Sequence, residues 1–535
     1  MESTSVTAAA SANPVSAAPA VWAQHKWLIA TAVMLGTTLE ILDTSIVNVA
    51  LPHIQGSLSA SVDEVTWVLT SYLLANGIMI PLTGWLSLRF GRKRYFITSV
   101  ATFVIASALC GAAQSLNQMV LFRLLQGAAG AAMIPTSQAI LIETFPPNEQ
   151  GLAMATWGLG VMVAPVIGPT LGGWITDLWS WRWNFYINVP IGILATVMVY
   201  AFVHDPPYMR DRREGRSDYG GIVLLAVSLG LLQIVLDRGQ RAGWFSAPWV
   251  CYSAIVSCAA AIALVWHELR FPEPVVDLRL LKIRNFDLPV IMIVGMSSVL
   301  WSVNFLNPLF LQQLMGYSAW QAGLAVAPRG VGVAAGAIFV GQVSRRGFDT
   351  RGLVALGFFL FAYATWLMAD WNLDVSMGSM MWPILLMGIG GGFIFPDVAA
   401  APLACVGPER VGYASSLFNL LRNTGSALGI SLVTNLLVSY QQLHQSYLAE
   451  HFSIFEAWRL ATALPRMPGA IGSDLYNSLG GGNHRQLALV YMVVQRQAAL
   501  LAYTDIYRVL AFIAAIFIPA GLWLTRPNGG RGLRH

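Results

Sequence analysis

The sequence predicts an all-α integral membrane protein. Of its 535 residues, 56% are hydrophobic and only 11% are charged, and the mean hydropathy is +0.60. A soluble protein carries about 25% charged residues, which it needs to cover its surface. A fold embedded in lipid needs far fewer, because acyl chains accept apolar side chains directly. Apolar runs of about 20 residues, long enough to cross a bilayer as helices, recur along the chain.

Fourteen such runs are predicted as membrane-spanning helices. An even number of spans places both termini on one side of the membrane. Most of the 31 Lys and Arg residues then fall on that side, with clusters at 89–94, 210–216 and 279–284, whereas the short loops of the other side carry few. Because cytoplasmic loops are enriched in Lys and Arg, both termini are expected in the cytoplasm. The runs begin near Trp27, Val65, Tyr95, Gln118, Gly151, Trp183, Tyr219, Pro248, Leu288, Ala319, Gly352, Met381, Val411 and Thr504.

A weak internal repeat suggests how the spans are grouped. Residues 84–91 follow the second span and residues 341–347 follow the tenth, and each stretch is a small-residue turn with basic side chains. If these turns correspond, spans 1–6 and 9–14 are repeats and spans 7 and 8 are an insertion, and such transporters bind substrate between the repeats. The expected division is a disordered tail 1–26, a six-helix bundle 27–203, two inserted helices with linkers 204–286, a second six-helix bundle 287–525 and a cytoplasmic tail 526–535.

One connection is much longer than the others. Residues 441–502 separate the last two spans on the outer face and contain three consecutive glycines, 480–482, followed by an apolar helical pattern from Gln486. Connections of this length are uncommon unless they have a function. Leu487, Leu489, Val490, Met492, Val493 and Val494 are expected to be exposed if the last helix projects from the bilayer, and an exposed apolar patch often marks an interaction site. A simple surface loop, or a lid over the protein's own outer mouth, remains an alternative.

Ionisable residues within the apolar runs are the strongest functional signal. Glu40 and Asp43 are three residues apart and therefore share a helix face. Charges at membrane depth are costly, and they usually mark ion or substrate paths or pair with one another. Two neighbouring carboxyl groups suit a site that loads and releases a proton. The predicted proton-coupling residues are Asp43, Glu40, Arg123 and Asp397; Arg329 and Arg422 are further intramembrane charges, and structural ion pairing is the alternative for each.

Aromatic residues within the spans are candidates for substrate contact. A pocket for lipophilic cations uses aromatic faces and acidic groups. Aromatic residues near helix ends are instead expected to anchor the protein at the membrane interface. The predicted substrate-binding residues are Tyr72, Trp157, Trp301, Phe305 and Asn304.

Several kinds of chemistry are not indicated. The four cysteines form no CxxC or Cys/His cluster, so no metal site is expected. There is no Walker A sequence, no HExxH and no GxSxG elbow, which argues against ATP use and against an enzyme. We expect no cofactor and no nucleic-acid partner, and an ion gradient as the energy source.

Five motifs occur in order over the first six spans: Leu42 to Pro52, Gly84 to Arg94, Arg123 to Gly127, Gly168 to Gly173 and Trp181 to Gly192. Together they resemble the major facilitator superfamily, in its fourteen-helix drug:proton antiporter branch of EmrB/QacA-like exporters. The resemblance implies two six-helix bundles plus two inserted helices, and proton-coupled export of amphiphilic drugs or toxic compounds across the bacterial inner membrane. It also implies a periplasmic membrane-fusion adaptor and an outer-membrane channel as partners.

Two of these motifs are expected to govern conformational change. The first comprises Gly84, Arg89, Gly91 and Arg92, and the second, which marks exporters in the family, comprises Gly168, Pro169, Gly172 and Gly173. The chain departs from the family at Leu88, where an acidic residue is usual, so the family's charge-paired lock is not expected in its usual form. A major facilitator transporter of another small solute, an importer included, and a non-transporting membrane receptor are the alternative functions.

Overall fold

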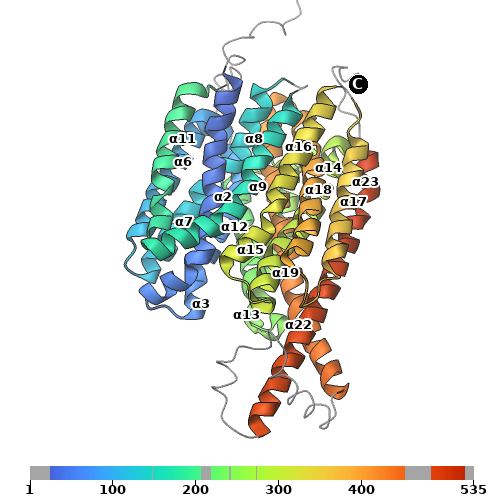
Figure 1. Ribbon diagram of the computed structural model, residues 1–535. Coiled ribbons are helices and arrows are strands. Elements are labelled where there is room, and N and C mark those ends of the chain that lie inside the picture. Colours follow the sequence, from blue (N-terminus) through green and yellow to red (C-terminus); the bar gives the residue numbers. More distant parts are fainter. Residues whose placement is uncertain are drawn as a thin grey trace, which may run out of the picture.

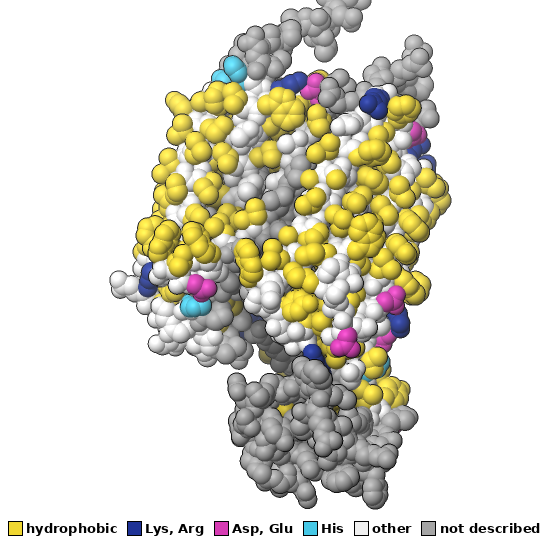
Figure 2. Space-filling model, in the orientation of Figure 1, with side chains coloured by type: hydrophobic (Ala, Val, Ile, Leu, Met, Phe, Trp, Pro, Cys, Tyr) yellow, Lys and Arg dark blue, Asp and Glu magenta, His cyan; other side chains and the backbone are white. Residues whose placement is uncertain are grey.

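The computed structural model describes residues 25–146, 149–205, 218–239, 242–272, 274–346, 348–451 and 483–524. These residues form helices and connecting turns, with no strand among them. The long helices run side by side (Figure 1). On the face shown in Figure 2, hydrophobic side chains cover the middle of the bundle, whereas charged side chains gather near its two ends. This distribution fits a lipid-embedded belt between two aqueous surfaces, and the predicted all-α membrane fold is confirmed.

The N-terminal helices pack around α2, which contacts α8, α9 and α11, while α4 packs on α7 and α6 packs on α7 and α11. Proline accounts for several breaks, because its ring removes one helical hydrogen bond: Pro81 lies in the 3-10 turn η1 between α4 and α5. The bounds are α2 Lys26–Ser57, α3 Val62–Val65, α4 Trp67–Met79, η1 Ile80–Leu82, α5 Thr83–Phe90, α6 Arg92–Ala112, α7 Leu116–Gly130, α8 Met133–Thr144, α9 Gln150–Leu178, α10 Trp183–Tyr186 and α11 Asn188–Phe202.

Two further helices, α12 (Tyr219–Arg238) and α13 (Pro248–Arg270), pack on each other. The 3-10 turn η3 (Trp244–Ser246) precedes α13, and α12 also lies against α4. Most residues of α13 are exposed in the isolated chain, Ile262 and Trp266 among them. An exposed apolar helix of 23 residues is suited to lipid contact.

The C-terminal helices form a second packed group. Here α18 packs between α16 and α17, α19 packs on α14 and α22, and α17 packs on α22 and α23. Glycines permit the closest contacts: a Cβ on Gly392 would lie 2.5 Å from the carbonyl oxygen of Val333 on α16. The bounds are η4 Leu278–Lys282, α14 Arg284–Leu309, η5 Phe310–Leu314 (a π turn), α15 Ala319–Val326, α16 Pro328–Arg345, α17 Arg351–Met368, α18 Met377–Ala404, η6 Pro408–Arg410, α19 Val411–His451, α22 Asn483–Ile516 and α23 Ile518–Trp523.

Twelve stretches of the described residues are long and apolar enough to cross a membrane. Several combine two helices, as Leu116–Thr144 combines α7 and α8. The other two predicted spans correspond to α9 and α19, of 29 and 41 residues, which pack within the bundle but fall outside this set of twelve. The count of fourteen spans remains a prediction.

The N-terminal and C-terminal helices meet along a surface that we call the seam. It consists of Gly84 and Ser87 on α5, Gln138 on α8 and Gly158 on α9, facing Phe395 on α18 and Gly412, Ser415, Ser416 and Asn419 on α19. Ser415 Oγ donates to the carbonyl oxygen of Pro135 at 2.7 Å, and Asn419 Nδ2 donates to Gln138 Oε1. These contacts lie near the start of α19, which begins at Val411, and they join the two groups of helices there.

At the opposite end α19 and α22 extend past the other helices (Figure 1). The predicted connection 441–502 is therefore partly helical, because α19 continues to His451 and α22 already begins at Asn483. The intervening residues, glycines 480–482 included, lie outside the described residues. The pair is joined by His444 and Asp505, whose Nε2 and Oδ2 atoms are 2.9 Å apart, and by Gln441, which donates to Gln495.

The prediction that the apolar residues before the last span are exposed is wrong at one position. Val494 is buried, with 7% of its surface exposed, and Met492 and Val493 are half-buried. The reason is that α22 packs along α19 rather than standing alone. The side chains of Leu487, Leu489 and Val490 lie outside the described residues.

The tail 1–26 is described only from His25 onward, where α2 begins at Lys26, and the tail 526–535 lies outside the described residues.

Candidate functional site

Asp43, in the middle of α2, is the centre of a buried polar network. The residue has no exposed surface. Its Oδ2 accepts a hydrogen bond from Arg123 Nη1 at 2.6 Å, and its Oδ1 accepts from Gln126 Nε2 at 2.9 Å and from Asn188 Nδ2 at 2.7 Å. Each carboxylate oxygen thus accepts at least one hydrogen bond. This arrangement joins α2 to α7 and α11.

Arg123 is held from several sides. Its Nε donates to the carbonyl oxygen of Val68 at 3.1 Å, and its Nη1 also donates to Gln126 Oε1 at 2.8 Å. The guanidinium carbon lies 4.3 Å from the centre of the Tyr72 ring, a cation–π distance. A guanidinium presents its donors in a rigid fork, so this geometry fixes the position of α7 relative to α2 and α4.

Glu40 lies one turn before Asp43 on the same helix and is held far more loosely. It is also buried, but only Oε1 has a partner, Asn76 Nδ2 at 3.0 Å. Oε2 has no hydrogen-bond partner. Arg422 on α19 interacts with Glu40 through its charge without forming an ion pair within 4 Å. Glu40 is therefore the carboxyl group of this pair with a free oxygen and with a cation across the bundle.

The intramembrane charges of the C-terminal helices are separated. Arg329 is buried on α16, and its Nη1 has no hydrogen-bond partner. Asp397 on α18 interacts with Thr350, before α17, and its Oδ2 has no partner. Asp397 is not among the charged groups that act on Glu40. The structure brings together Glu40, Asp43 and Arg123, with Arg422 nearby, and it places Asp397 in another environment.

The predicted substrate residues differ in exposure. Tyr72 is buried beneath Arg123, and its hydroxyl has no hydrogen-bond partner. Trp157 is buried within the seam, stacked on Phe395 at 5.8 Å, and its Nε1 donates to Ser137 Oγ at 2.9 Å. Both rings are buried, and neither lines the groove described below.

The remaining three candidates lie on consecutive turns of α14. Trp301 is 38% exposed, and Phe305 is half-buried. Asn304 Oδ1 is buried without a partner. A polar atom left unpaired in an apolar bundle is costly, and a substrate group could satisfy it.

The first glycine motif lies where α5 packs against the C-terminal helix α19. A Cβ on Gly84 would lie 2.8 Å from the carbonyl oxygen of Gly412, so only glycine fits. Gly91 has a φ of +84°, which favours glycine, and it precedes α6. Arg89 lies over the ring of Trp85.

A charge pair is present here despite Leu88. Arg92 forms an ion pair with Glu143 on α8, and Arg92 is buried. The backbone N–H of Lys93 donates to Asp205 Oδ1 at 2.7 Å, so a residue after α11 caps α6. The pair joins two N-terminal helices, and it therefore does not itself bridge the seam.

The second glycine motif provides the contact of α9 with α2. A Cβ on Gly168 would lie 2.5 Å from Ser45 Cβ, and one on Gly172 would lie 3.1 Å from Ile46 Cα. Gly173 is half-buried. The side chain of Pro169 lies outside the described residues. The two helices are in close contact within two turns of Asp43 and Glu40. Movement of α9 would therefore shift α2 and the positions of these carboxyl groups.

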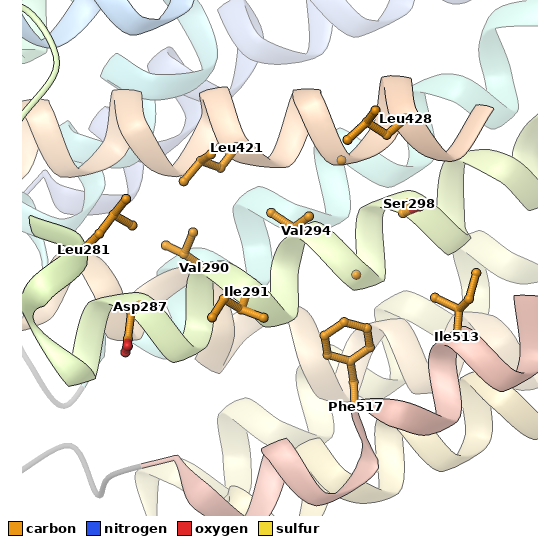
Figure 3. A pocket seen from close by; sticks show the side chains of 12 residues that line it. Leu281, Asp287, Val290, Ile291, Val294, Ser298, Leu421, Leu428, Ile513 and Phe517 are labelled. Atoms are coloured by element: carbon orange, nitrogen blue, oxygen red, sulfur yellow. The ribbon is translucent and has the colours of Figure 1, made fainter. Parts of the chain in front are cut away.

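An apolar groove lies apart from this network. It has a volume of about 610 Å³ and runs between α14, α19 and the α22–α23 segment (Figure 3). Val290 and Val294 form one wall, Leu421 and Leu428 another, and Phe517 faces them. Asp287 is its one charged lining residue. None of the predicted substrate residues lines this groove.

Four polar partners in the network were not assigned roles from the sequence: Asn76, Ser107, Gln126 and Asn188. Gln126 and Asn188 lie within two of the five motifs. A polar amide in an apolar run costs free energy unless it is bonded. That cost is the signal that could have identified them.

Membrane-spanning helices in two packed groups, with ionisable side chains buried among the helices, are typical of a membrane transporter. A family model described as "Major Facilitator Superfamily" matches residues 33–430. The chain belongs to the major facilitator superfamily, as a transporter rather than an enzyme.

The relatives agree with this assignment. The chain is 34% identical over 509 residues to the Multidrug export protein EmrB of Escherichia coli, covering 94% of this chain and 96% of that protein. It is 34% identical over 501 residues to the Fatty acid resistance protein FarB of Neisseria gonorrhoeae, covering 93% and 96%. The human organic anion transporter MFSD10 has a similar fold, with a TM-score of 0.56, 16% identity and coverage of 91% of this chain and 99% of that one.

Proposed function

We propose that this chain is a proton-coupled antiporter that exports amphiphilic drugs or other toxic compounds across the bacterial inner membrane. The observation that carries the proposal is the contrast between the two carboxyl groups on α2. Asp43 accepts three hydrogen bonds and pairs with Arg123, whereas Glu40 keeps a buried oxygen free. A group that must gain and lose a proton in each cycle needs such freedom, and Glu40 is the proposed carrier.

Glu40 also occupies a suitable place. Its carboxyl group belongs to an N-terminal helix, and the charge that acts on it across the bundle, Arg422, belongs to a C-terminal helix. Protonation of Glu40 removes this attraction between the two groups of helices. A proton can thereby shift the balance between two conformations, which is what coupling requires.

Asp43 and Arg123 have a supporting role in this proposal. Their pair sets the position of α7 and keeps Tyr72 beneath the guanidinium, close to Glu40. Among the C-terminal helices, Asn304 Oδ1 and Arg329 Nη1 are unpaired, and they could bind polar groups of a drug. Asp397 lies apart from this network, and we assign it no direct proton transfer.

We further propose that both termini are cytoplasmic and that α19 and α22 project into the periplasm. Lys26 begins α2 and Arg92 begins α6, and basic residues at such helix ends are expected on a cytoplasmic face. The projecting helices would then reach a membrane-fusion adaptor, which connects to an outer-membrane channel. The relatives named multidrug export and fatty acid resistance proteins support export as the direction of transport.

The proposal is tested in proteoliposomes that contain the purified chain alone. An outward-directed flux of a lipophilic cation such as ethidium should require an opposing proton gradient and should collapse when an ionophore dissipates that gradient. Flux that proceeds equally without any proton gradient would contradict proton coupling.

A further inference from the structure

A second pair of buried carboxyl groups lies at the inserted helices, away from the proposed transport site. Asp218 precedes α12, and Glu268 lies near the end of α13. Asp218 is 1% exposed and Glu268 has no exposed surface. Charged side chains are almost never buried so completely unless they are paired or neutralised.

Each carboxyl group uses one oxygen for a structural bond. Asp218 Oδ1 accepts from the N–H of Gly221 at 2.8 Å, capping α12, and it lies 2.7 Å from His267 Nε2. Glu268 Oε2 accepts from the N–H of Val276 at 3.2 Å. The pair therefore ties the start of α12 to the end of α13 and to the chain leading into α14.

The other two oxygens, Asp218 Oδ2 and Glu268 Oε1, have no hydrogen-bond partner. Both face the backbone of Gly221, where a Cβ would lie 2.5 Å from the first and 2.8 Å from the second. They are thus no farther apart than the sum of these distances. Two carboxylates this close in a buried site cannot readily both be ionised.

Among the described residues, one cationic side chain lies against the pair: His267, whose Nε2 is 2.7 Å from Asp218 Oδ1. Asp218 and His267 are the charged groups that act on Glu268. Arg270 lies over Trp266, and Arg279 donates to the carbonyl oxygens of Leu269 and Phe271. Asp277 caps η4, and α4, which packs on α12, carries no charged side chain. His267 is partly exposed, and it links Asp218 to solvent.

We propose that Asp218 and Glu268 share one proton, forming a proton-binding site at the junction of the inserted helices. The proton is held between Asp218 Oδ2 and Glu268 Oε1, and His267 provides the route by which it exchanges with water. Loss of this proton leaves two anions facing each other and loosens the junction. The site is distinct from Glu40, and the proposal does not depend on drug export.

The test uses the purified full-length protein in lipid nanodiscs. Infrared spectroscopy detects the C=O band of a protonated carboxyl group at neutral pH, and Glu268→Gln should remove a band that Glu40→Gln leaves in place. Asp218→Asn provides a second variant that retains the helix cap. Glu64→Gln, at an exposed carboxylate, is the matched control and should remove no such band.

Thermal unfolding gives an independent readout. Wild type should lose stability as rising pH removes the shared proton, whereas Glu268→Gln, which cannot form two anions, should lose less over the same range. Unchanged bands in both Glu268→Gln and Asp218→Asn would overturn the proposal. Stabilisation of wild type by sodium or potassium chloride, but not by choline chloride, would also overturn it, because a metal cation would then occupy the gap.

Discussion

The guanidinium of Arg123 lies 2.6 Å from the carboxylate of Asp43, and both side chains are excluded from solvent. A buried ion pair of this kind holds helices in position, because breaking it would leave a buried charge without its partner. The free carboxyl oxygen one turn away, on Glu40, belongs to a residue without that constraint. Asp43 is therefore expected to act as a structural residue and Glu40 as the proton site.

The Asp43–Arg123 pair is expected to show strong coupling in a double-mutant cycle. Asp43→Asn or Arg123→Gln alone should each destabilise the protein by about 3–5 kcal/mol, because the remaining charge is buried without its partner. The double variant should be more stable than the sum of the two losses predicts. Unfolding of purified protein in detergent measures this. Strictly additive losses would show that the two charges do not depend on each other.

Asp43→Asn should also abolish gradient-driven export, since displaced α7 and Tyr72 can no longer hold the site around Glu40. The comparison with Glu40→Gln distinguishes the two roles. Both should stop export, but only Asp43→Asn should lower the unfolding temperature clearly. Normal efflux by folded Asp43→Asn protein would remove Asp43 from the account.

Close packing of α9 on α2 should be required for the transport cycle. Gly172→Leu and Gly168→Leu place a side chain against Ile46 and Ser45, where a Cβ alone would already be too close. We expect membrane insertion with little or no flux. Gly77→Leu is the control, because nothing lies within 4 Å of a Cβ at that position. Wild-type flux in Gly172→Leu would show that this contact can open without consequence.

The seam should open during each cycle. A Cβ on Gly412 would lie 3.3 Å from Ser87 Oγ, which is close to disulfide geometry. Ser87→Cys with Gly412→Cys, in a background lacking the four native cysteines, should cross-link on mild oxidation and stop flux, and a reductant should restore it. Each single cysteine variant serves as control. Full flux in fully cross-linked protein would mean that the seam stays closed during transport.

The segment that joins the projecting helices α19 and α22 is expected to serve a partner rather than the transport step. Deletion of residues 453–481, which lie outside the described residues, should leave flux in adaptor-free vesicles unchanged and abolish drug resistance of whole cells. An internal control retains the deleted length as a Gly/Ser linker. If vesicle flux fails as well, this segment covers the transporter's own mouth, and the adaptor assignment falls.

The fold class was predictable from the sequence because composition and the length of apolar runs are decided by the bilayer itself. The site was only partly predictable. Spacing placed Glu40 and Asp43 on one face, but no spacing shows that Asn188, 145 residues from Asp43 along the chain, turns its amide toward it. Contacts between residues far apart in the sequence depend on how helices pack, and the sequence of one helix alone does not determine that packing.

Two local expectations show the same limit. Val494 was expected on a surface, yet α22 lies along α19 and buries it. Because Leu88 stands where the family usually has an acidic residue, the usual charge-paired lock was not expected. The structure nevertheless pairs Arg92 with Glu143 on another helix. The sequence correctly predicted a helix at Val494 and a cationic side chain at Arg92. The packing of a neighbouring helix determined whether the first is buried and what the second pairs with.

The most direct test of the proposed function is gradient-driven transport by Glu40→Gln in proteoliposomes. The glutamine keeps an oxygen that can accept the hydrogen bond from Asn76, so the protein should fold and bind ethidium, but it cannot exchange a proton. We expect wild type to accumulate the drug against its gradient while protons move the opposite way, and Glu40→Gln only to equilibrate it. Proton-driven accumulation by Glu40→Gln at the wild-type level would show that Glu40 is not the proton carrier.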